Sequence, residues 1–281
     1  MMTGAVSANP NDVVPQLSED QQTFFAQSGY LVLRGLLDER ERADLVTWTE
    51  EVKGWPNTPG AHMPYEEVDK SGRRFLTRTE NYANFHQGFG ALLRGQRLCE
   101  MLAQLSGEEM VLFKEKINYK AAGGGRFDPH TDSPAYQHIA ALKHLTILIA
   151  VEPATAENGY LEVVPGSHLI RNIPLNEDHT IKREWERAHE WEPVPLDTGD
   201  MLIFGSFLAH RSGPNNSPHG RAAIYATYNS LSEGGDQHDD YYAHRRKIWP
   251  PTFEREPGKR YKEGYDLYAW GTPMTTVEMA A

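Results

Sequence analysis

The N-terminal third of the chain alternates short amphipathic runs with one apolar run. Ser18 and Gln21 have the spacing of a capping box, which predicts a helix that begins there. Residues 30–33 (Tyr-Leu-Val-Leu) predict a short strand. Asp38 and Glu41 repeat the capping spacing and predict a second helix.

The middle of the chain changes from helical to strand-like patterning. Residues 55–74 hold three prolines and several polar residues, so we expect a loop, and the apolar spacing of residues 85–105 predicts one long helix. Beyond Gly107 come short apolar runs separated by Gly, Pro and Asn, with no helical pattern between them: residues 110–119, 144–151, 160–164, 201–204 and 222–228. Such runs are typical of antiparallel strands in a sandwich, jelly roll or barrel.

The domain organisation follows from these changes, because no linker divides the chain. Residues 1–16 are small, polar and proline-containing, and predict a flexible N-terminal arm. We expect one domain over residues 17–281, with a helical part (about 17–107), a β-core (about 108–230) and a C-terminal extension (about 231–281). The extension is rich in aromatic residues and is expected to pack over an edge of the core.

Composition narrows the possible functions. The 281 residues are 39% hydrophobic and 10% aromatic, which is enough apolar surface for a folded core. The formal net charge is −11, with 39 acidic against 28 basic residues, so nucleic acid is a poor partner. No apolar run approaches the roughly 20 residues of a membrane span. We therefore expect a cytoplasmic protein, while the oligomeric state stays open.

Cysteine usage limits the possible metal ligands. Cys99 is the single cysteine of the chain, so neither an internal disulfide nor a thiolate zinc site can form. Any metal must be held by His, Asp or Glu.

Two pairs of residues place a histidine two positions before an acid. With 12 histidines and 39 acids among 281 residues, roughly 1.7 such pairs arise by chance, and two occur, His130/Asp132 and His238/Asp240. On a strand, both members of a pair point to the same face. His130 follows the three glycines 123–125 and lies between apolar runs, whereas His238 lies in a polar stretch. We keep the first pair as metal ligands and discard the second.

A third ligand and an anion-binding residue follow further along the chain. His210 ends an apolar run and precedes a turn, which makes it the best candidate for the third ligand. The alternative is that it simply ends a strand and binds no metal. Arg221 begins the strand-like run 222–228. Because a buried guanidinium in an acidic protein needs an anion, we expect it to bind a carboxylate.

The ordered motifs resemble the phytanoyl-CoA dioxygenase family of Fe(II)- and 2-oxoglutarate-dependent oxygenases. The resemblance covers residues 17–230 and is carried by His-Thr-Asp at 130–132, Asn-Gly-Tyr-Leu-Glu-Val-Val-Pro-Gly-Ser-His at 158–168, residues 199–204, residues 210–215 and Arg221. It implies a mostly β fold, a double-stranded β-helix (a cupin-like jelly roll), with flanking N-terminal helices. It also implies that His130, Asp132 and His210 bind iron. Arg221 would pair with the far carboxylate of 2-oxoglutarate, assisted by Ser212.

Residues 114–118 (Lys-Glu-Lys-Ile-Asn) extend the resemblance to the ectoine hydroxylase of this family. By that analogy Lys116 and Asn118 help to hold 2-oxoglutarate, and Lys114 lies nearer the substrate. Arg78 lies in a stretch similar to another pocket-lining segment of the family and is a second substrate-binding candidate. The alternative for the strand residues is a solvent-exposed face.

The implied reaction consumes 2-oxoglutarate and O2 and releases succinate and CO2 while a small-molecule metabolite is hydroxylated, with ascorbate supporting activity in vitro. Two histidines and one carboxylate leave three iron positions open for the keto acid and O2. In related halogenases the acid is replaced by a small residue, so Asp132 argues against halogenation. Hydroxylation is the expected outcome, and desaturation, ring closure and endoperoxide formation are left open. The substrate is left open among an organophosphonate, a carboxylate and a natural-product intermediate.

Two other functions compete with this one. A non-catalytic metal- or ligand-binding β-domain would keep the fold, but the complete ligand set with Arg221 argues for catalysis. A zinc or manganese hydrolase on a cupin-like barrel would not need an arginine at this position, and its activity would survive the substitution Arg221→Ala.

Overall fold

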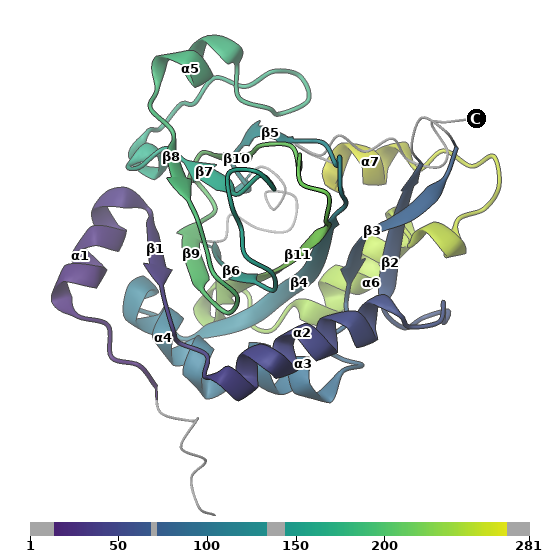
Figure 1. Ribbon diagram of the computed structural model, residues 1–281, viewed down its shortest axis with the longest axis horizontal. Helices are drawn as coiled ribbons and strands as arrows, with labels where there is room; N and C mark the ends of the chain where they lie inside the picture. The colour runs from purple at the N-terminus through teal and green to yellow at the C-terminus, as the bar shows by residue number, and fades with distance from the viewer. Residues whose placement is uncertain (1–13, 69–71, 134–143, 269–281) are drawn as a thin grey trace, which may run out of the picture.

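Two antiparallel β-sheets lie face to face, and helices cover the outer side of the larger one (Figure 1). The computed structural model describes residues 14–68, 72–133 and 144–268. Within those residues the larger sheet has the strand order β1-β9-β6-β11-β4-β3-β2 and the smaller one the order β5-β10-β7-β8. The strands are β1 (Tyr30–Leu33), β2 (Met63–Val68), β3 (Arg74–Glu80), β4 (Met110–Lys120), β5 (Phe127–His130), β6 (His144–Ala150), β7 (Leu161–Val163), β8 (Glu192–Val194), β9 (Met201–Gly205), β10 (His210–Ser212) and β11 (Arg221–Ser230).

The first two helices begin where the capping boxes predicted. Ser18 Oγ accepts a hydrogen bond from the Gln21 N–H at 3.2 Å, and Asp38 Oδ1 accepts one from the Glu41 N–H at 2.8 Å. The helices of the described residues are α1 (Glu19–Ser28), α2 (Glu39–Lys53), α3 (Gln87–Leu93), α4 (Gln96–Ser106), α5 (Arg183–Ala188), α6 (His238–Ile248) and α7 (Lys262–Tyr268).

The apolar core has two main layers. Between the N-terminal helices and the larger sheet, Leu45, Leu102 and Ile224 belong to one buried cluster. Between the two sheets, Val163 and Phe204 belong to a second. Because fully burying one such side chain contributes about 1.5–3 kcal/mol, these layers hold the sheets and helices in register. The expectation of a mostly β fold with flanking helices is confirmed.

The prolines of residues 55–74 predicted a loop, but the structure has a strand within this stretch. This strand is β2, which pairs with β3 through Met63 opposite Glu80 and Pro64 opposite Thr79. β2 is the edge strand of its sheet, and an edge strand tolerates proline because one side needs no N–H donor.

The single helix expected over residues 85–105 is two helices, α3 and α4. Gly95 between them adopts an extended backbone, with φ −65° and ψ 145°, and starts α4. A Cβ at this position would lie 2.6 Å from the Ala91 carbonyl oxygen, so the tight junction requires glycine.

The N-terminal part contributes strands as well as helices. β1 is the strand predicted over residues 30–33, whereas β2 and β3 were not predicted, and all three belong to the larger sheet. The short helix α5, also not predicted, lies within the part expected to be the β-core. Three-residue strands such as β8 and β10 carry too little periodicity to be seen in sequence.

The C-terminal helices pack over the β2, β3 and β4 side of the larger sheet, as the aromatic pattern predicted (Figure 1). Tyr241, Tyr242 and Trp249 join Tyr65 of β2 and Phe113 of β4 in one buried cluster. The domain boundaries themselves stay a prediction, and most of the expected N-terminal arm lies outside the described residues.

A β-bulge in β4 changes which side chains face the inside. Thr227 of β11 pairs with Lys114, but the next residue, Tyr228, pairs with Leu112, so Phe113 is the extra residue. Leu112 before the bulge and Ile117 after it both pack against the helical layer. Before the bulge the even-numbered residues of β4 face the helices, and after it the odd-numbered residues do. The even-numbered residues after the bulge therefore face the other sheet.

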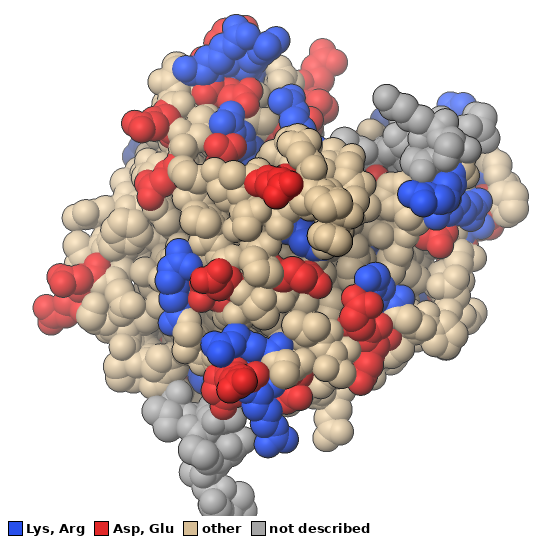
Figure 2. Space-filling view, in the orientation of Figure 1, with Lys and Arg blue, Asp and Glu red and all other residues tan. Residues whose placement is uncertain are grey.

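The surface seen in Figure 2 mixes acidic and basic side chains without one continuous basic field. Of the described helices, none combines the length and the apolar character that crossing a bilayer requires.

Candidate active site

The three predicted metal ligands meet between β5 and β10. His210 of β10 pairs directly with His130 of β5, and their rings are 4.2 Å apart. An Asp132 carboxylate oxygen lies 3.7 Å from His130 Nε2 and 3.8 Å from His210 Nε2. One ligand atom from each residue lies within 4.8 Å of the other two, the only such group of His, Cys, Asp or Glu among the described residues.

Backbone carbonyls orient both imidazoles. His130 Nδ1 lies 2.7 Å from the Asp128 carbonyl oxygen, and His210 Nδ1 lies 3.0 Å from the Leu208 carbonyl oxygen. Each Nδ1 therefore donates its proton to the carbonyl, which leaves the Nε2 lone pair directed toward Asp132. This is the arrangement in which neutral imidazoles bind a metal.

The protonation states also fit a divalent cation. Burial lowers the pKa of His130 to about 4, and the neighbouring His210 adds to the shift. Burial alone would raise the pKa of Asp132, but His210, His130 and Lys116 outweigh it and hold that pKa below its usual value. Two histidines and one carboxylate are the ligand set of a non-haem Fe(II) centre with three open positions.

The cavity beside these ligands contains Lys114, Lys116 and Asn118, the strand residues predicted to face the site. The β4 bulge is what turns them inward. The described lining residues are Lys114, Lys116, Asn118, Phe127, His130, Asp132, Thr146, Leu161, His210, Arg211, Ser212, Tyr225 and Thr227.

Lys114 and Lys116 place two amines side by side in this cavity. Withdrawal from water lowers the pKa of Lys114 to about 7, with repulsion from Lys116 adding to the shift. Burial, with repulsion from Arg78, also lowers the pKa of Lys116. The Lys116 Nζ lies 5.1 Å from the Tyr225 ring centre and the Lys114 Nζ 5.9 Å from that of Tyr241. A bound anion would stabilise the charged form of both amines.

A second group of cations lies at the Ser212 side of the cavity and includes Lys120, which the sequence analysis missed. Lys120 Nζ donates to Ser212 Oγ at 3.0 Å, and the buried Arg221 guanidinium donates to the Asn158 carbonyl at 3.1 Å. Both cations also reach the Gly159 carbonyl oxygen. Burial, with repulsion from Arg221, lowers the pKa of Lys120 to about 7. Lys120 continues the even-numbered alternation of β4, and that spacing was the available signal.

Arg221, Arg78 and Lys120 are not among the described residues that line the cavity, but each lies next to one that is. Arg221 pairs with Lys120 across β11 and β4, next to Ser212. Arg78 pairs with Asn118 across β3 and β4, and its Nε lies 3.3 Å from the Glu80 carboxylate.

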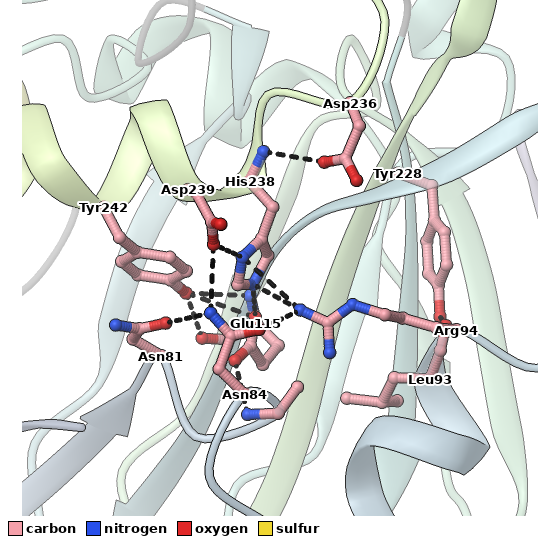
Figure 3. Close-up of polar contacts among 11 residues, drawn as sticks. Asn81, Asn84, Leu93, Arg94, Glu115, Tyr228, Asp236, His238, Asp239 and Tyr242 are labelled. Atoms are coloured by element: carbon pink, nitrogen blue, oxygen red, sulfur yellow. Dashed lines mark hydrogen bonds and ion pairs between the residues drawn. The ribbon is translucent and has the colours of Figure 1, made fainter. Parts of the chain in front are cut away.

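His238, from the discarded pair, is buried although it lies in a polar stretch of the sequence. It begins α6, is only 2% exposed and lies 2.7 Å from the carboxylate of Glu115 on β4 (Figure 3). Its partner is therefore a buried carboxylate on a distant strand.

Two antiparallel sheets that bring two histidines and an aspartate to one point define the class of Fe(II)- and 2-oxoglutarate-dependent dioxygenases. The chain belongs to the phytanoyl-CoA dioxygenase (PhyH) family, whose sequence profile matches residues 25–223. It is therefore an oxidoreductase that uses Fe(II) and 2-oxoglutarate. The non-catalytic domain and the zinc or manganese hydrolase are set aside.

Curated relatives cover nearly the whole chain. A 2-aminoethylphosphonate dioxygenase of the uncultured bacterium HF130_AEPn_1 is 35% identical over 92% of this chain and 98% of its own. A methylphosphonate hydroxylase of Gimesia maris is 40% identical over 82% of this chain and 87% of its own.

A solved structure confirms the fold. The crystal structure of EctD from S. alaskensis with 2-oxoglutarate and 5-hydroxyectoine superposes with a TM-score of 0.66, at 20% identity, over 80% of this chain and 82% of its own. This similarity confirms the double-stranded β-helix.

Proposed function

We propose that this enzyme hydroxylates an organophosphonate. The observation that carries the proposal is the pair of amines, Lys114 and Lys116, inside the cavity that also holds the three metal ligands. Burial lowers the pKa of both amines, so a bound anion would stabilise their charged form.

In this proposal His130, Asp132 and His210 hold the iron. Fe(II), when bound, supplies the activation of O2 that oxidises 2-oxoglutarate to succinate and CO2 and inserts one oxygen atom into a substrate C–H bond. The protein's part is to orient both organic molecules and to exclude water from between them.

The residues assigned to 2-oxoglutarate form two groups. Lys116 and Asn118 lie in the cavity beside the metal ligands, where the keto-acid end would bind. The second group is Lys120 and Arg221, which lie beside Ser212. These residues would bind the carboxylate of 2-oxoglutarate that lies far from the iron.

Lys114 is assigned to the phosphonate. It lies two residues before Lys116 on β4, on the same face of the strand, and its charge affects the Asp132 pKa less than that of Lys116 does. Arg78, whose charge lowers the pKa of Lys116, would add positive charge beside it. A phosphonate, with three acceptor oxygens and up to two negative charges, suits such a site better than a carboxylate, and two relatives are named for phosphonate substrates.

The test is a comparison of matched acids. The purified protein would be incubated with Fe(II), ascorbate, O2 and 2-oxoglutarate together with methylphosphonate, 2-aminoethylphosphonate, acetate or 3-aminopropionate. Succinate and phosphorus NMR spectra would be followed, and we expect stoichiometric succinate and a new phosphorus signal with at least one phosphonate. Product from the carboxylates alone would overturn the proposal.

A further inference from the structure

Glu115 lies on β4 between the two cavity lysines, but its side chain points to the opposite face. Its carboxylate is buried, with 1% of the residue exposed. One oxygen accepts a hydrogen bond from the Ala83 N–H at 2.8 Å, and the other lies 2.7 Å from His238 Nε2 of α6 (Figure 3). The C-terminal extension therefore reaches the back of the strand that carries Lys114 and Lys116.

Tyr242, one helical turn after His238, binds the backbone of Glu115. Its hydroxyl accepts from the Glu115 N–H at 2.9 Å and donates to the Glu115 carbonyl oxygen at 2.6 Å. β3 ends at Glu80, which pairs with Lys116, so the sheet supplies no strand partner for Glu115 on this edge. The Tyr242 hydroxyl instead forms hydrogen bonds with both the N–H and the carbonyl oxygen of Glu115.

Further polar groups hold His238 in place. Its backbone N–H donates to Asp236 at 3.1 Å, and its Nδ1 lies 3.3 Å from the Asp239 carboxylate. The Arg94 guanidinium lies 3.4 Å from the same ring, and Asn84 donates to Asp239 at 3.0 Å (Figure 3). The imidazole thus faces carboxylates from β4 and α6 and one guanidinium from the end of α3.

We propose that Glu115, His238 and Tyr242, here called the α6 latch, are positioning residues that set the place of the Lys114 and Lys116 amines in the cavity. The inference rests on the proposed phosphonate-hydroxylase function. Successive strand residues point to opposite faces, so fixing the backbone and side chain of Glu115 fixes the direction in which its two neighbours leave the strand.

The expected consequence is selective. A misplacement of about 1 Å in a substrate-positioning group can cost about 100-fold in rate. The metal ligands and Ser212 lie on β5, β10 and the adjoining turn, away from the latch, and they should keep their geometry. Lys116, which is assigned to 2-oxoglutarate, is also held by its pairing with Glu80 of β3, whereas β3 does not reach Lys114. Loss of the latch should therefore displace Lys114 most, and weaken phosphonate binding and coupling more than the binding of 2-oxoglutarate.

The test compares Tyr242→Phe with Tyr228→Phe. Both hydroxyls are buried, but the Tyr228 hydroxyl donates to the Leu93 carbonyl at 2.8 Å and does not touch Glu115. For Tyr242→Phe we expect the KM for the phosphonate to rise about tenfold and more succinate to form per product, while the KM for 2-oxoglutarate changes less than about twofold. Tyr228→Phe should leave all three quantities near those of the wild type.

Equal kinetics for the two phenylalanine variants would overturn the latch. A wild-type enzyme that turns over no phosphonate would overturn the proposed function and the latch with it, so the two failures are distinguishable.

A second comparison covers the case in which Tyr242→Phe does not fold. Glu115→Gln and His238→Gln would each unbalance the buried pair, whereas the double variant replaces it by two amides that can bond to each other. We expect each single variant to raise the KM for the phosphonate and the double variant to recover part of the loss. Additive losses in the double variant would contradict the latch.

Discussion

The metal ligands and the amines of β4 line one cavity, but different kinds of contact hold them. Each ligand histidine is oriented by the carbonyl two residues before it, as His130 is by Asp128. The strand that carries the amines is held from behind by His238 and Tyr242, which are 123 and 127 positions from Glu115 in sequence. The orientation of each ligand histidine is thus set locally once β5 and β10 have paired, whereas Lys114 and Lys116, here called the cationic wall, depend on contacts with the C-terminal extension. The two should therefore fail separately when mutated.

The largest effect is expected at the metal centre. The substitution Asp132→Ala removes the one carboxylate among the three ligands and leaves two imidazoles. Removing an outer partner of a ligand already costs about 10- to 100-fold, so loss of the ligand should reduce turnover by at least about 100-fold, with or without a phosphonate. Succinate release and iron content would measure this. Full activity with bound iron would contradict the assignment of Asp132.

The next effect is expected at the cationic wall. Lys114→Met keeps the length of the side chain but removes its charge. A charged hydrogen bond contributes about 1.5–3 kcal/mol, so kcat/KM for the phosphonate should fall about 10- to 100-fold while 2-oxoglutarate is still consumed without product. Lys182→Met, at an exposed lysine before α5, is the matched control. Unchanged phosphonate kinetics would remove Lys114 from the substrate site.

A smaller effect is expected where the far carboxylate of 2-oxoglutarate would bind. The pKa of Lys120 is lowered to about 7, so its amine is charged below that pH and neutral above it. The KM for 2-oxoglutarate should therefore rise as the pH increases beyond about 7, by up to about tenfold. In Lys120→Met the KM should be high at every pH. A pH dependence retained by this variant would show that another group titrates.

The smallest effect concerns the buried Glu115–His238 pair. Burial alone would lower the pKa of His238, but the hydrogen bond and the charge of Glu115 outweigh it, and the net pKa is raised. A raised folded-state pKa stabilises the protein below the unfolded value of about 6.5, and this contribution is lost as the pH rises through the folded-state pKa. The melting temperature of the wild type should exceed that of His238→Gln by about 2–4 °C near pH 6, and the difference should shrink at higher pH. A difference that grows with pH would contradict a protonated His238.

The metal ligands could be predicted from the sequence more fully than the lysines of β4. His130, Asp132 and His210 could be recognised because their motifs lie in short local segments whose geometry is set within a few residues. Lys120 could have been predicted from its place at every second position after Lys116 and Asn118. The bulge at Phe113, which makes these positions face the cavity, has no sequence signal of its own.

Other features could not be predicted because they depend on contacts between distant segments. His238 lies in a polar stretch, and only the packing of α6 on β4 shows that its partner is the buried Glu115. β2 was hidden by a proline that an edge strand tolerates, and an edge position becomes visible only when the whole sheet is assembled.

The central claim, that the metal centre and the cationic wall act separately in one cavity, is tested most directly by visible absorption without oxygen. Protein, Fe(II) and 2-oxoglutarate should form a charge-transfer band of equal strength in the wild type and in Lys114→Met, and no band in Asp132→Ala. Added phosphonate should shift the band in the wild type alone. A band that persists in Asp132→Ala, or one that is lost in Lys114→Met, would contradict the account.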